Sequence, residues 1–288
     1  MKLNRIAPFG AAVAFALAGV LATPATAQDD AGSSNWTGPY IGGSLGYNWQ
    51  PNNTANDIEQ VYFDTNGDGQ YGDIVRTPAG GNAFAPGFCN GKATSATTCS
   101  RGDREGKAAW SVMAGYDRQF GNIVVGGVIE GGQSYGSNYV SGFSTTPASY
   151  TLVRRLDWEA AARLRAGYSL NRTLIYATGG LAYGKFKNSF LTTNTANAFA
   201  ENNRTEDDWG YTVGGGIDQK ISDNFSIGLL YRYTRFNPND YSVTVTQGSA
   251  PATNPFVNPA STSGQTVIGR SNEQYTTQSV RVTAAYRF

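Results

Sequence analysis

Residues 154–187, RRLDWEAAARLRAGYSLNRTLIYATGGLAYGKFK, contain two β-like runs separated by a short polar break at Asn171-Arg172. In the first run, apolar side chains occupy one parity and most charged side chains occupy the other. The apolar members are Leu156, Trp158, Ala160, Ala162, Leu164, Ala166 and Tyr168, and the charged members are Asp157, Glu159, Arg163 and Arg165. A period of two residues is typical of a β-strand with two chemically different faces. A short break between two such runs predicts a β-hairpin.

Similar runs recur along the chain. The eight candidate strands cover residues 36–49, 107–120, 123–135, 154–169, 173–187, 207–221, 225–236 and 273–288. The connections between them alternate in length, and the long ones cover residues 50–105, 136–153, 188–206 and 237–272. This asymmetry is typical of a transmembrane barrel with short periplasmic turns and longer external loops. The sequence therefore predicts an all-β fold, a transmembrane antiparallel up-and-down β-barrel of about eight strands.

The parity of the charged residues predicts which face of each strand points into the barrel. In a membrane barrel, apolar side chains face lipid and polar side chains face the lumen. The expected lumen residues are Asp117, Glu130, Asp157, Glu159, Arg163, Arg165, Asp218, Lys220, Arg232 and Arg281. An eight-stranded lumen is only wide enough for side chains, so opposite charges there should pair. A polar core that holds the barrel closed is favoured over the alternative, a narrow ion path.

The N-terminus has the pattern of a cleavable secretory signal. A basic start and an apolar run at 11–22 are followed by Ala25-Thr26-Ala27, which fits the rule of small residues before a cleavage site. The apolar run is too short to span a bilayer comfortably. The expected organisation is a cleaved signal peptide (1–27), a short periplasmic tail (28–35) and the barrel (36–288), with 50–105 as its long first external loop.

The first external loop holds both cysteines of the chain, Cys89 and Cys99. In an exported protein the surroundings are oxidising, and two nearby cysteines are expected to pair. We therefore predict a Cys89–Cys99 disulfide that staples this loop locally, with two free thiols as the alternative.

The same loop contains DTNGDGQYGD at 64–73, which matches the front half of a calcium-binding loop. The candidate ligands are Asp64, Asn66, Asp68, Gln70 and Asp73, and Gly69 allows the sharp turn that such loops need. Val75 occupies the twelfth position, where a bidentate acid is usual. Two interpretations remain open: a Ca²⁺ site, and an Asn/Asp/Gly turn without metal.

The composition argues against catalysis and against a nucleic-acid partner. The chain has no histidine. Outer-membrane acyltransferases and lipases of this size use histidine as the general base beside serine. Lysine and arginine number 22 against 21 aspartates and glutamates, a balance that indicates no polyanion partner. We therefore predict that the protein is not an enzyme, although chemistry by carboxylates alone stays open.

Four segments resemble a known family. They are NWTGPYIGGSLGYNW (35–49), LRAGYSLNRTLIYATGGLAYG (164–184), WGYTVGGGIDQKISDNFSIGLLYRYTRF (209–236) and SVRVTAAYRF (279–288). Together they resemble the small eight-stranded outer-membrane β-barrels of α-proteobacteria, within the OmpA-like and opacity-type porin superfamily. The last segment is similar to the signal read by the barrel assembly machinery, with Phe288 as the terminal aromatic residue and Tyr286 two residues before it.

This resemblance implies a place in the outer membrane of a Gram-negative bacterium and a set of partners. The partners are the barrel assembly machinery, outer-membrane lipids and lipopolysaccharide. The N-terminus of some related barrels is joined to peptidoglycan, but Gln28 stands where a small residue is expected. A disordered polar tail is therefore favoured over a peptidoglycan link here. The predicted function is a structural outer-membrane protein whose surface-exposed loops contribute to envelope integrity and surface interactions. The alternatives are a small-solute porin, a surface adhesin or ligand-binding barrel, and a soluble lipocalin-like carrier.

Overall fold

The computed structural model describes residues 35–50, 59–100, 107–260 and 262–288. Regular structure within these residues is entirely β, and they contain no helix long and apolar enough to cross a bilayer. The expected signal peptide (1–27) and nearly all of the expected tail (28–35) lie outside the described residues.

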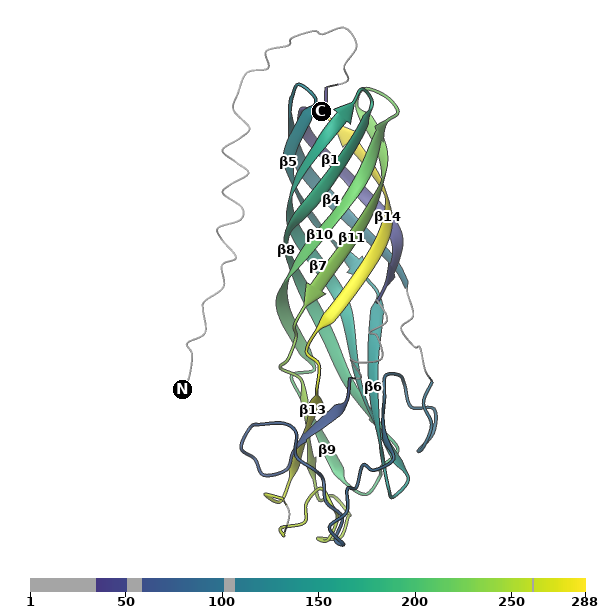
Figure 1. The fold of residues 1–288 in the computed structure, drawn as a ribbon, viewed down its shortest axis with the longest axis vertical. Helices are drawn as coiled ribbons and strands as arrows, with labels where there is room; N and C mark the ends of the chain where they lie inside the picture. Colours follow the sequence, from purple (N-terminus) through teal and green to yellow (C-terminus); the bar gives the residue numbers. More distant parts are fainter. Residues whose placement is uncertain (1–34, 51–58, 101–106, 261) are drawn as a thin grey trace. The chain divides into compact units, whose positions relative to one another are not determined.

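Eight long strands form a closed antiparallel barrel (Figure 1). They are β1 (Gly38–Trp49), β4 (Lys107–Phe120), β5 (Ile123–Ser134), β7 (Ala148–Leu170), β8 (Thr173–Thr192), β10 (Thr205–Lys220), β11 (Phe225–Phe236) and β14 (Tyr275–Arg287). Each strand pairs with the next along the chain, and β14 returns to pair with β1. Closure leaves no unpaired edge in the barrel wall, which a strand in lipid requires because no water is present to satisfy its backbone. The predicted up-and-down barrel is confirmed.

The barrel is taller on one side than the alternation of its sequence predicts. Strand β7 begins at Ala148 and β8 ends at Thr192, beyond the expected limits at 154 and 187. The first part of β7 pairs with β6 (Gly136–Ser144), and the second part pairs with β5. Strands β5 and β6 are separated by Tyr135 alone.

A β-bulge in β7 changes which side chains point inward. The register against β8 shifts between Leu156 and Trp158. A bulge adds one residue to one strand, so Asp157 and Trp158 both face outward while Leu156 and Glu159 both face inward. Parity along this strand predicts Leu156 on the lipid side and Asp157 in the lumen. Both assignments are wrong, because the strict alternation fails at this one point.

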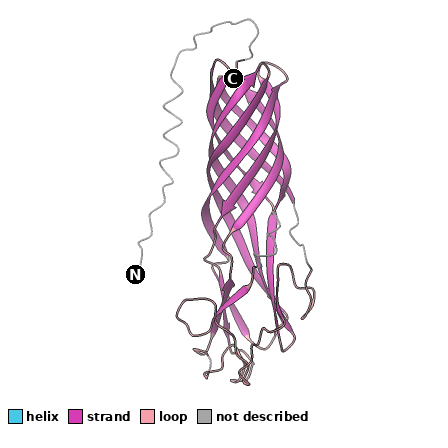
Figure 2. Ribbon diagram, in the orientation of Figure 1, coloured by secondary structure: helices cyan, strands magenta, loops and turns pink. Residues whose placement is uncertain are grey.

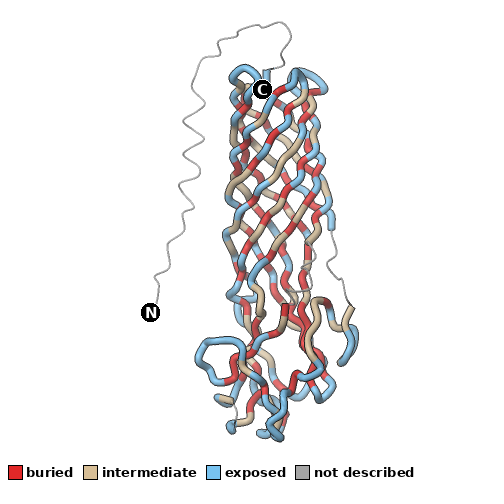
Figure 3. The backbone as a smooth tube through the Cα atoms, in the orientation of Figure 1, coloured by how far each residue is buried: buried red, intermediate tan, exposed pale blue. Residues whose placement is uncertain are grey.

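Elsewhere buried and exposed positions alternate along the barrel strands (Figure 3). The exposed positions carry mainly apolar side chains, and the buried positions include most of the charged ones. Leu45 and Leu164 are the most exposed apolar side chains, at 71% and 75%, whereas Arg163 beside Leu164 is 4% exposed. Trp158, Tyr183 and Trp209 gather toward one end of this wall, and Tyr286 and Phe288 lie at the other. Aromatic side chains at two levels are typical of the two interfaces of a membrane.

The long connections fold into a second structure, here called the head, at the end of the barrel opposite the three short turns (Figure 2). Its four-stranded sheet has the order β2 (Val61–Asp64), β13 (Thr266–Arg270), β12 (Ser242–Thr246) and β9 (Ala198–Asn202). Strand β3 (Gly87–Cys89) pairs with β6. These segments were expected to be loops, and the expectation is wrong. Their strands are only three to nine residues long and mostly pair across large sequence separations, so no local pattern marks them.

The head has an apolar core of its own. Phe63, Phe84, Tyr150 and Phe256 are each at most 4% exposed, and the ring centroids of Phe63 and Phe84 are 4.4 Å apart. Around them pack Val61, Val75, Val140, Leu152, Val243, Val245, Val257 and Ile268. The buried Tyr241 hydroxyl donates to Glu201 Oε2 at 2.7 Å, and burial together with this carboxylate raises the pKa of Tyr241.

Candidate functional site

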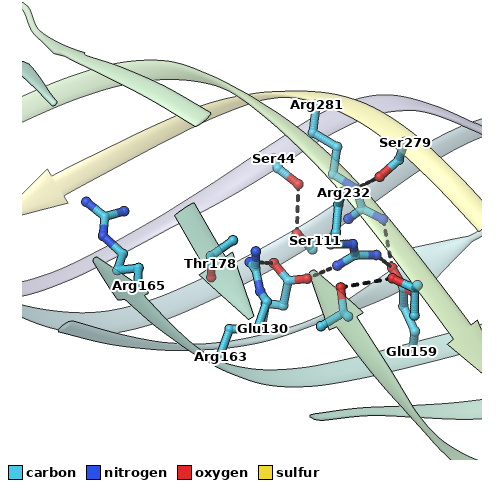
Figure 4. A network of polar contacts seen from close by, with 12 residues as sticks. Ser44, Ser111, Glu130, Glu159, Arg163, Arg165, Thr178, Arg232, Ser279 and Arg281 are labelled. Atoms are coloured by element: carbon cyan, nitrogen blue, oxygen red, sulfur yellow. Dashed lines mark hydrogen bonds and ion pairs between the residues drawn. The ribbon is translucent and has the colours of Figure 1, made fainter. Parts of the chain in front are cut away.

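The middle of the lumen is filled by an ion-pair network centred on Arg232 (Figure 4). The Arg232 guanidinium donates to both Glu130 and Glu159. Arg163 donates to the second oxygen of Glu130 at 2.7 Å, and Arg281 donates to Glu159 at 2.7 Å. These five side chains come from β5, β7, β11 and β14 and are all at most 8% exposed. The network therefore connects strands from different sides of the barrel.

A second ion-pair network lies nearer the short-turn end. Asp117 contacts Arg165 at 3.0 Å and Arg287 at 2.8 Å, and Arg165 also contacts Asp218 at 3.2 Å. Arg287 was not among the predicted lumen residues. It shares the parity of Ser279, Arg281 and Thr283 in the last strand, so the sequence did contain the signal that identifies it.

Aromatic layers lie at both ends of these networks. At the short-turn end, Trp36 is fully buried, and the charged groups of Lys220 and Arg287 lie 5.3 and 5.6 Å from its ring centre. Toward the head, the rings of Phe186, Phe236 and Tyr275 pack edge to face at centroid distances of 5.4 and 5.1 Å. The polar core is thus closed by aromatic side chains above and below.

A third charged cluster joins the barrel to the head. Arg154 and Arg270 share Glu59, at 3.5 and 2.6 Å. Arg154 also donates to the backbone carbonyls of Pro238, Asn272 and Glu273 at 2.8–3.0 Å, and Arg270 donates to that of Leu152 at 2.6 Å. Sequence reasoning missed this cluster. The bulge conceals the inward direction of Arg154, and its two charged partners lie in segments that were expected to be loops.

Little space remains between these layers. A cavity of about 20 Å³ lies beside Tyr40, Arg163 and Arg165, and one of about 60 Å³ lies beside Arg154 and Glu206. A water molecule needs roughly 10–15 Å³ by this measure, so the cavities hold one and a few waters respectively. Two larger hollows, of about 560 and 440 Å³, are lined mainly by outward-facing side chains of the barrel wall.

The structure brings eight of the ten predicted lumen residues into the two ion-pair networks of the lumen, and Asp157 and Lys220 lie outside them. The Asp157 carboxylate contacts Lys187 at 2.7 Å and Arg155 at 3.5 Å on the outer wall. Lys220 lies at the short-turn end, where its ammonium group donates to the carbonyls of Asn35 and Asp223 at 2.5 and 3.0 Å.

The predicted calcium ligands are engaged within their own loop. The Asp64 carboxylate accepts the backbone N–H groups of Gly67 and Gly69 at 2.7 and 2.9 Å, and Asp73 accepts that of Thr65 at 2.8 Å. Asn66 and Asp68 cap the turn in the same way, each accepting the backbone N–H two residues further on. Within the described part of the chain, no group of three or more His, Cys, Asp or Glu is placed to hold a metal ion. The contacts are those of an Asx-type turn.

The remaining predicted residues lie at the two ends of the molecule. Cys89 and Cys99 form the predicted disulfide in the head, which is confirmed. Tyr286 and Phe288, the predicted assembly signal, are exposed on the outer wall at the short-turn end, with ring centroids 5.2 Å apart.

Several known proteins are similar to this chain. The 22 kDa outer membrane protein of Rhizobium leguminosarum is 33% identical over 132 residues, which is 46% of this chain and 54% of the relative. The 31 kDa outer-membrane immunogenic protein of Brucella melitensis is 32% identical over 133 residues, 43% of this chain and 51% of the relative. The chain thus spans about half the length of the curated relatives that it matches.

Among solved structures, the outer membrane protein OprG of Pseudomonas aeruginosa covers 90% of this chain and is itself covered completely. Its identity is 10% and its TM-score is 0.46, so we draw no functional conclusion from it. The family model of the outer membrane protein beta-barrel domain matches residues 13–288. The chain therefore belongs to the outer membrane β-barrel family and is an integral β-barrel protein of the Gram-negative outer membrane.

Proposed function

We propose that this protein is a structural barrel with a closed lumen, which anchors a folded head at the cell surface and contributes to envelope integrity and surface interactions. The observation that carries the proposal is the filling of the lumen. Arg232 connects carboxylates from two strands at mid-barrel, and an aromatic layer lies on either side of the charged layers. Eight-stranded barrels are wide enough for side chains only, and these side chains leave cavities the size of a few waters.

The energetic cost of opening supports the same role. A solute path through the middle of the barrel requires Arg232 to leave Glu130 and Glu159, both of which are buried. Removing one partner of a buried ion pair costs about 3–5 kcal/mol. Thermal fluctuation alone therefore opens such a path only rarely, and the lumen serves to hold the strands together.

Planar-bilayer recording tests this role against the small-solute porin. Refolded protein should give no steady, resolved single-channel steps, while a general porin reconstituted in parallel confirms that the bilayers report channels. A reproducible unitary conductance, in a preparation whose barrel is shown to be monomeric and folded, contradicts the structural role and favours the porin.

Surface binding by the head is the second candidate. Tyr62, Tyr71 and Ile74 are 36–48% exposed in the first long connection, on a head that packs around its own apolar core. The Brucella relatives are named as immunogenic outer-membrane proteins, which supports display of this end at the cell surface.

Replacing residues 50–105 by a short Gly/Ser linker tests the second candidate. If the head binds cells or a surface, adhesion of bacteria that display the protein should fall, while the heat-modifiable gel shift of the folded barrel persists. Tyr62→Ser with Tyr71→Ser is the matched point variant, because it removes exposed rings without deleting a strand. Undiminished adhesion in both variants contradicts a binding role for this segment. Peptidoglycan attachment of the N-terminal tail and recognition of Tyr286 and Phe288 by the assembly machinery stay predictions.

A further inference from the structure

The described part of the lumen contains one more cation than its carboxylates can balance. Between the aromatic layers of Trp36 and Phe186, five arginines face four carboxylates, and each of these residues is at most 8% exposed. They are Arg163, Arg165, Arg232, Arg281 and Arg287 against Asp117, Glu130, Glu159 and Asp218. Arginine does not lose its proton in proteins, so the fifth charge persists. A buried charge without a counter-charge is costly, and we therefore expect a further anion in the lumen.

The charged groups on the far sides of the two aromatic layers do not supply this anion. At the short-turn end, Lys220 adds another cation. On the head side, two buried carboxylates lie with two arginines, and these four residues are Glu59, Glu206, Arg154 and Arg270. Asp208, on the same side, is partly exposed and accepts the Asn237 N–H at 2.6 Å. The missing counter-charge therefore belongs inside the lumen.

The lumen cavity of about 20 Å³ adjoins the network that carries the excess charge. Its lining includes three arginines, Arg163, Arg165 and Arg287, and one carboxylate, Asp218. Arg163 also belongs to the central network, in which three arginines share two glutamates (Figure 4). The volume accommodates one species of the size of a water molecule. A chloride ion is only slightly wider than water, whereas sulfate and phosphate carry four oxygens and do not fit.

Three hydrogen-bond donors on the lining side chains have no hydrogen-bond partner among the described residues. They are Arg163 Nε, Arg165 Nη2 and the hydroxyl of Tyr40, and each of these atoms is buried. The lining carboxylate, Asp218, is already engaged by Arg165 at 3.2 Å. Unmatched donors around a small space require a ligand that accepts hydrogen bonds. A water molecule would accept them but would leave the fifth charge uncompensated, so the charge favours an anion.

We propose that the barrel binds one small monovalent anion of the halide class, such as chloride, among Arg163, Arg165 and Tyr40. The ion compensates the fifth arginine and is an integral part of the folded lumen. It binds when the barrel folds, because the site is assembled from β1 and β7, which the folded barrel alone brings together. The proposal goes beyond the structural role proposed above, and its test fails separately from the conductance and adhesion tests.

Unfolding of the refolded protein by urea in detergent tests the proposal, with chloride exchanged for gluconate at constant ionic strength. An ion that binds only the folded barrel stabilises it by mass action. Above its dissociation constant, each tenfold rise in chloride concentration should therefore lower the unfolding equilibrium constant about tenfold. Sulfate at the same ionic strength should act like gluconate, because it is too large for the cavity.

Three variants locate the effect. R163Q leaves four arginines against four carboxylates and should abolish the dependence on chloride. Y40F removes one donor and keeps the ring, and it should raise the apparent dissociation constant of chloride about tenfold, because a hydrogen bond to a charged group is lost. R118Q is the matched control, since Arg118 is exposed on the outer wall, and it should keep the wild-type dependence. The heat-modifiable gel shift establishes folding, and Y40F alone decides if R163Q does not fold.

Three results would overturn the proposal. The first is an unfolding equilibrium constant that does not change with chloride, which would mean that the cavity holds water only. The second is equal stabilisation by sulfate, which would mean unspecific binding or screening at the surface. The third is an undiminished chloride dependence in the folded variants at Arg163 and Tyr40, which would place the ion elsewhere. Anomalous scattering from crystals grown in bromide gives the position directly, and a peak beside Arg163 and Arg165 supports the proposal.

Discussion

The barrel and the head solve the same packing problem in opposite ways. In the barrel, charged side chains such as Arg163, Arg232 and Glu159 are buried, while leucines and valines lie on the outside. In the head, Phe63, Phe84 and Phe256 are buried and polar groups are outside. The surroundings explain the difference. Lipid accepts apolar side chains at no cost, so the barrel interior is left for polar groups, whereas water drives the apolar groups of the head inward.

The comparison shows that burial alone does not identify a core. The charged side chains of the lumen are as buried as the apolar side chains of the head core, and barrel stability depends on pairing these charges rather than on removing apolar area from water. A buried ion pair is costly to break because the remaining charge has no solvent. The two regions should therefore respond differently to truncation, and the predictions below separate them.

Removing the central arginine should have the largest effect. Arg232→Ala leaves Glu130 and Glu159 without the guanidinium that both contact. We expect a loss of about 3–5 kcal/mol in the free energy of barrel unfolding, measured by denaturant titration of the refolded protein in detergent. Arg232→Lys, which keeps the charge, should recover part of it. A loss below about 1 kcal/mol would mean that the lumen is more hydrated than its cavities indicate.

Truncating a buried aromatic residue in the head should lower the unfolding free energy of the head about as much as Arg232→Ala lowers that of the barrel. The barrel itself should remain folded. Phe84 is 2% exposed and contacts the rings of Phe63, Tyr150 and Phe256. Phe84→Ala should lower the stability of the head by about 3–5 kcal/mol. Limited proteolysis should then cleave the head faster while the heat-modifiable band of the barrel stays unchanged. If the barrel transition shifts equally, the two regions unfold as one unit.

An arginine in the lipid-facing part of the barrel wall should destabilise the protein far more than an arginine on the outer face of the wall near the head. Leu164→Arg places arginine in the middle of the apolar belt and should cost about 2–4 kcal/mol. Leu191→Arg is the control, because Leu191 is also exposed, at 46%, but lies at the head end of β8. Its effect should stay below about 0.5 kcal/mol. Equal costs at the two positions would place the membrane boundary elsewhere on the wall.

Removing the disulfide should weaken the head only. Cys89→Ser with Cys99→Ser opens a link across a sequence separation of 10. In the chain-entropy model this costs about 2–3 kcal/mol, here confined to the segment that the link closes. Proteolysis of that segment with and without reductant measures the effect. If reductant does not change the rate at which the wild-type protein is cleaved, the pairing of β3 with β6 is sufficient to keep the segment folded without the disulfide.

An exposed ion pair should matter least. Arg172 contacts Asp223 at 3.0 Å between two short turns, and both side chains are more than half exposed. Arg172→Gln should change the unfolding free energy by less than about 1 kcal/mol, and the difference should shrink further in high salt. A larger effect would mean that the short turns, and not the lumen, determine barrel stability.

How far the sequence predicted the site depended on how local each signal was. Arg163, Arg165, Arg232 and Arg281 could be placed in the lumen because alternation along a single strand fixes their direction. Arg287 could have been found by the same rule. The cluster of Glu59, Arg154 and Arg270 could not. The bulge beyond Leu156 reverses the parity that would have placed Arg154 inward, and Glu59 and Arg270 lie in segments that contact it only across large sequence separations.

The sequence by itself determined the eight barrel strands, their order and the side of the wall on which most residues lie. These features depend on a two-residue period and on short turns, and both can be recognised within a single segment of the chain. Only the tertiary structure decided three features. The bulge at Leu156 turned Asp157 outward, the short strands of the head found partners across the molecule, and Phe256 became buried although its segment is rich in proline and asparagine. Each of these three features depends on contacts with other segments of the chain, and the periodicity within one segment carries no information about such contacts.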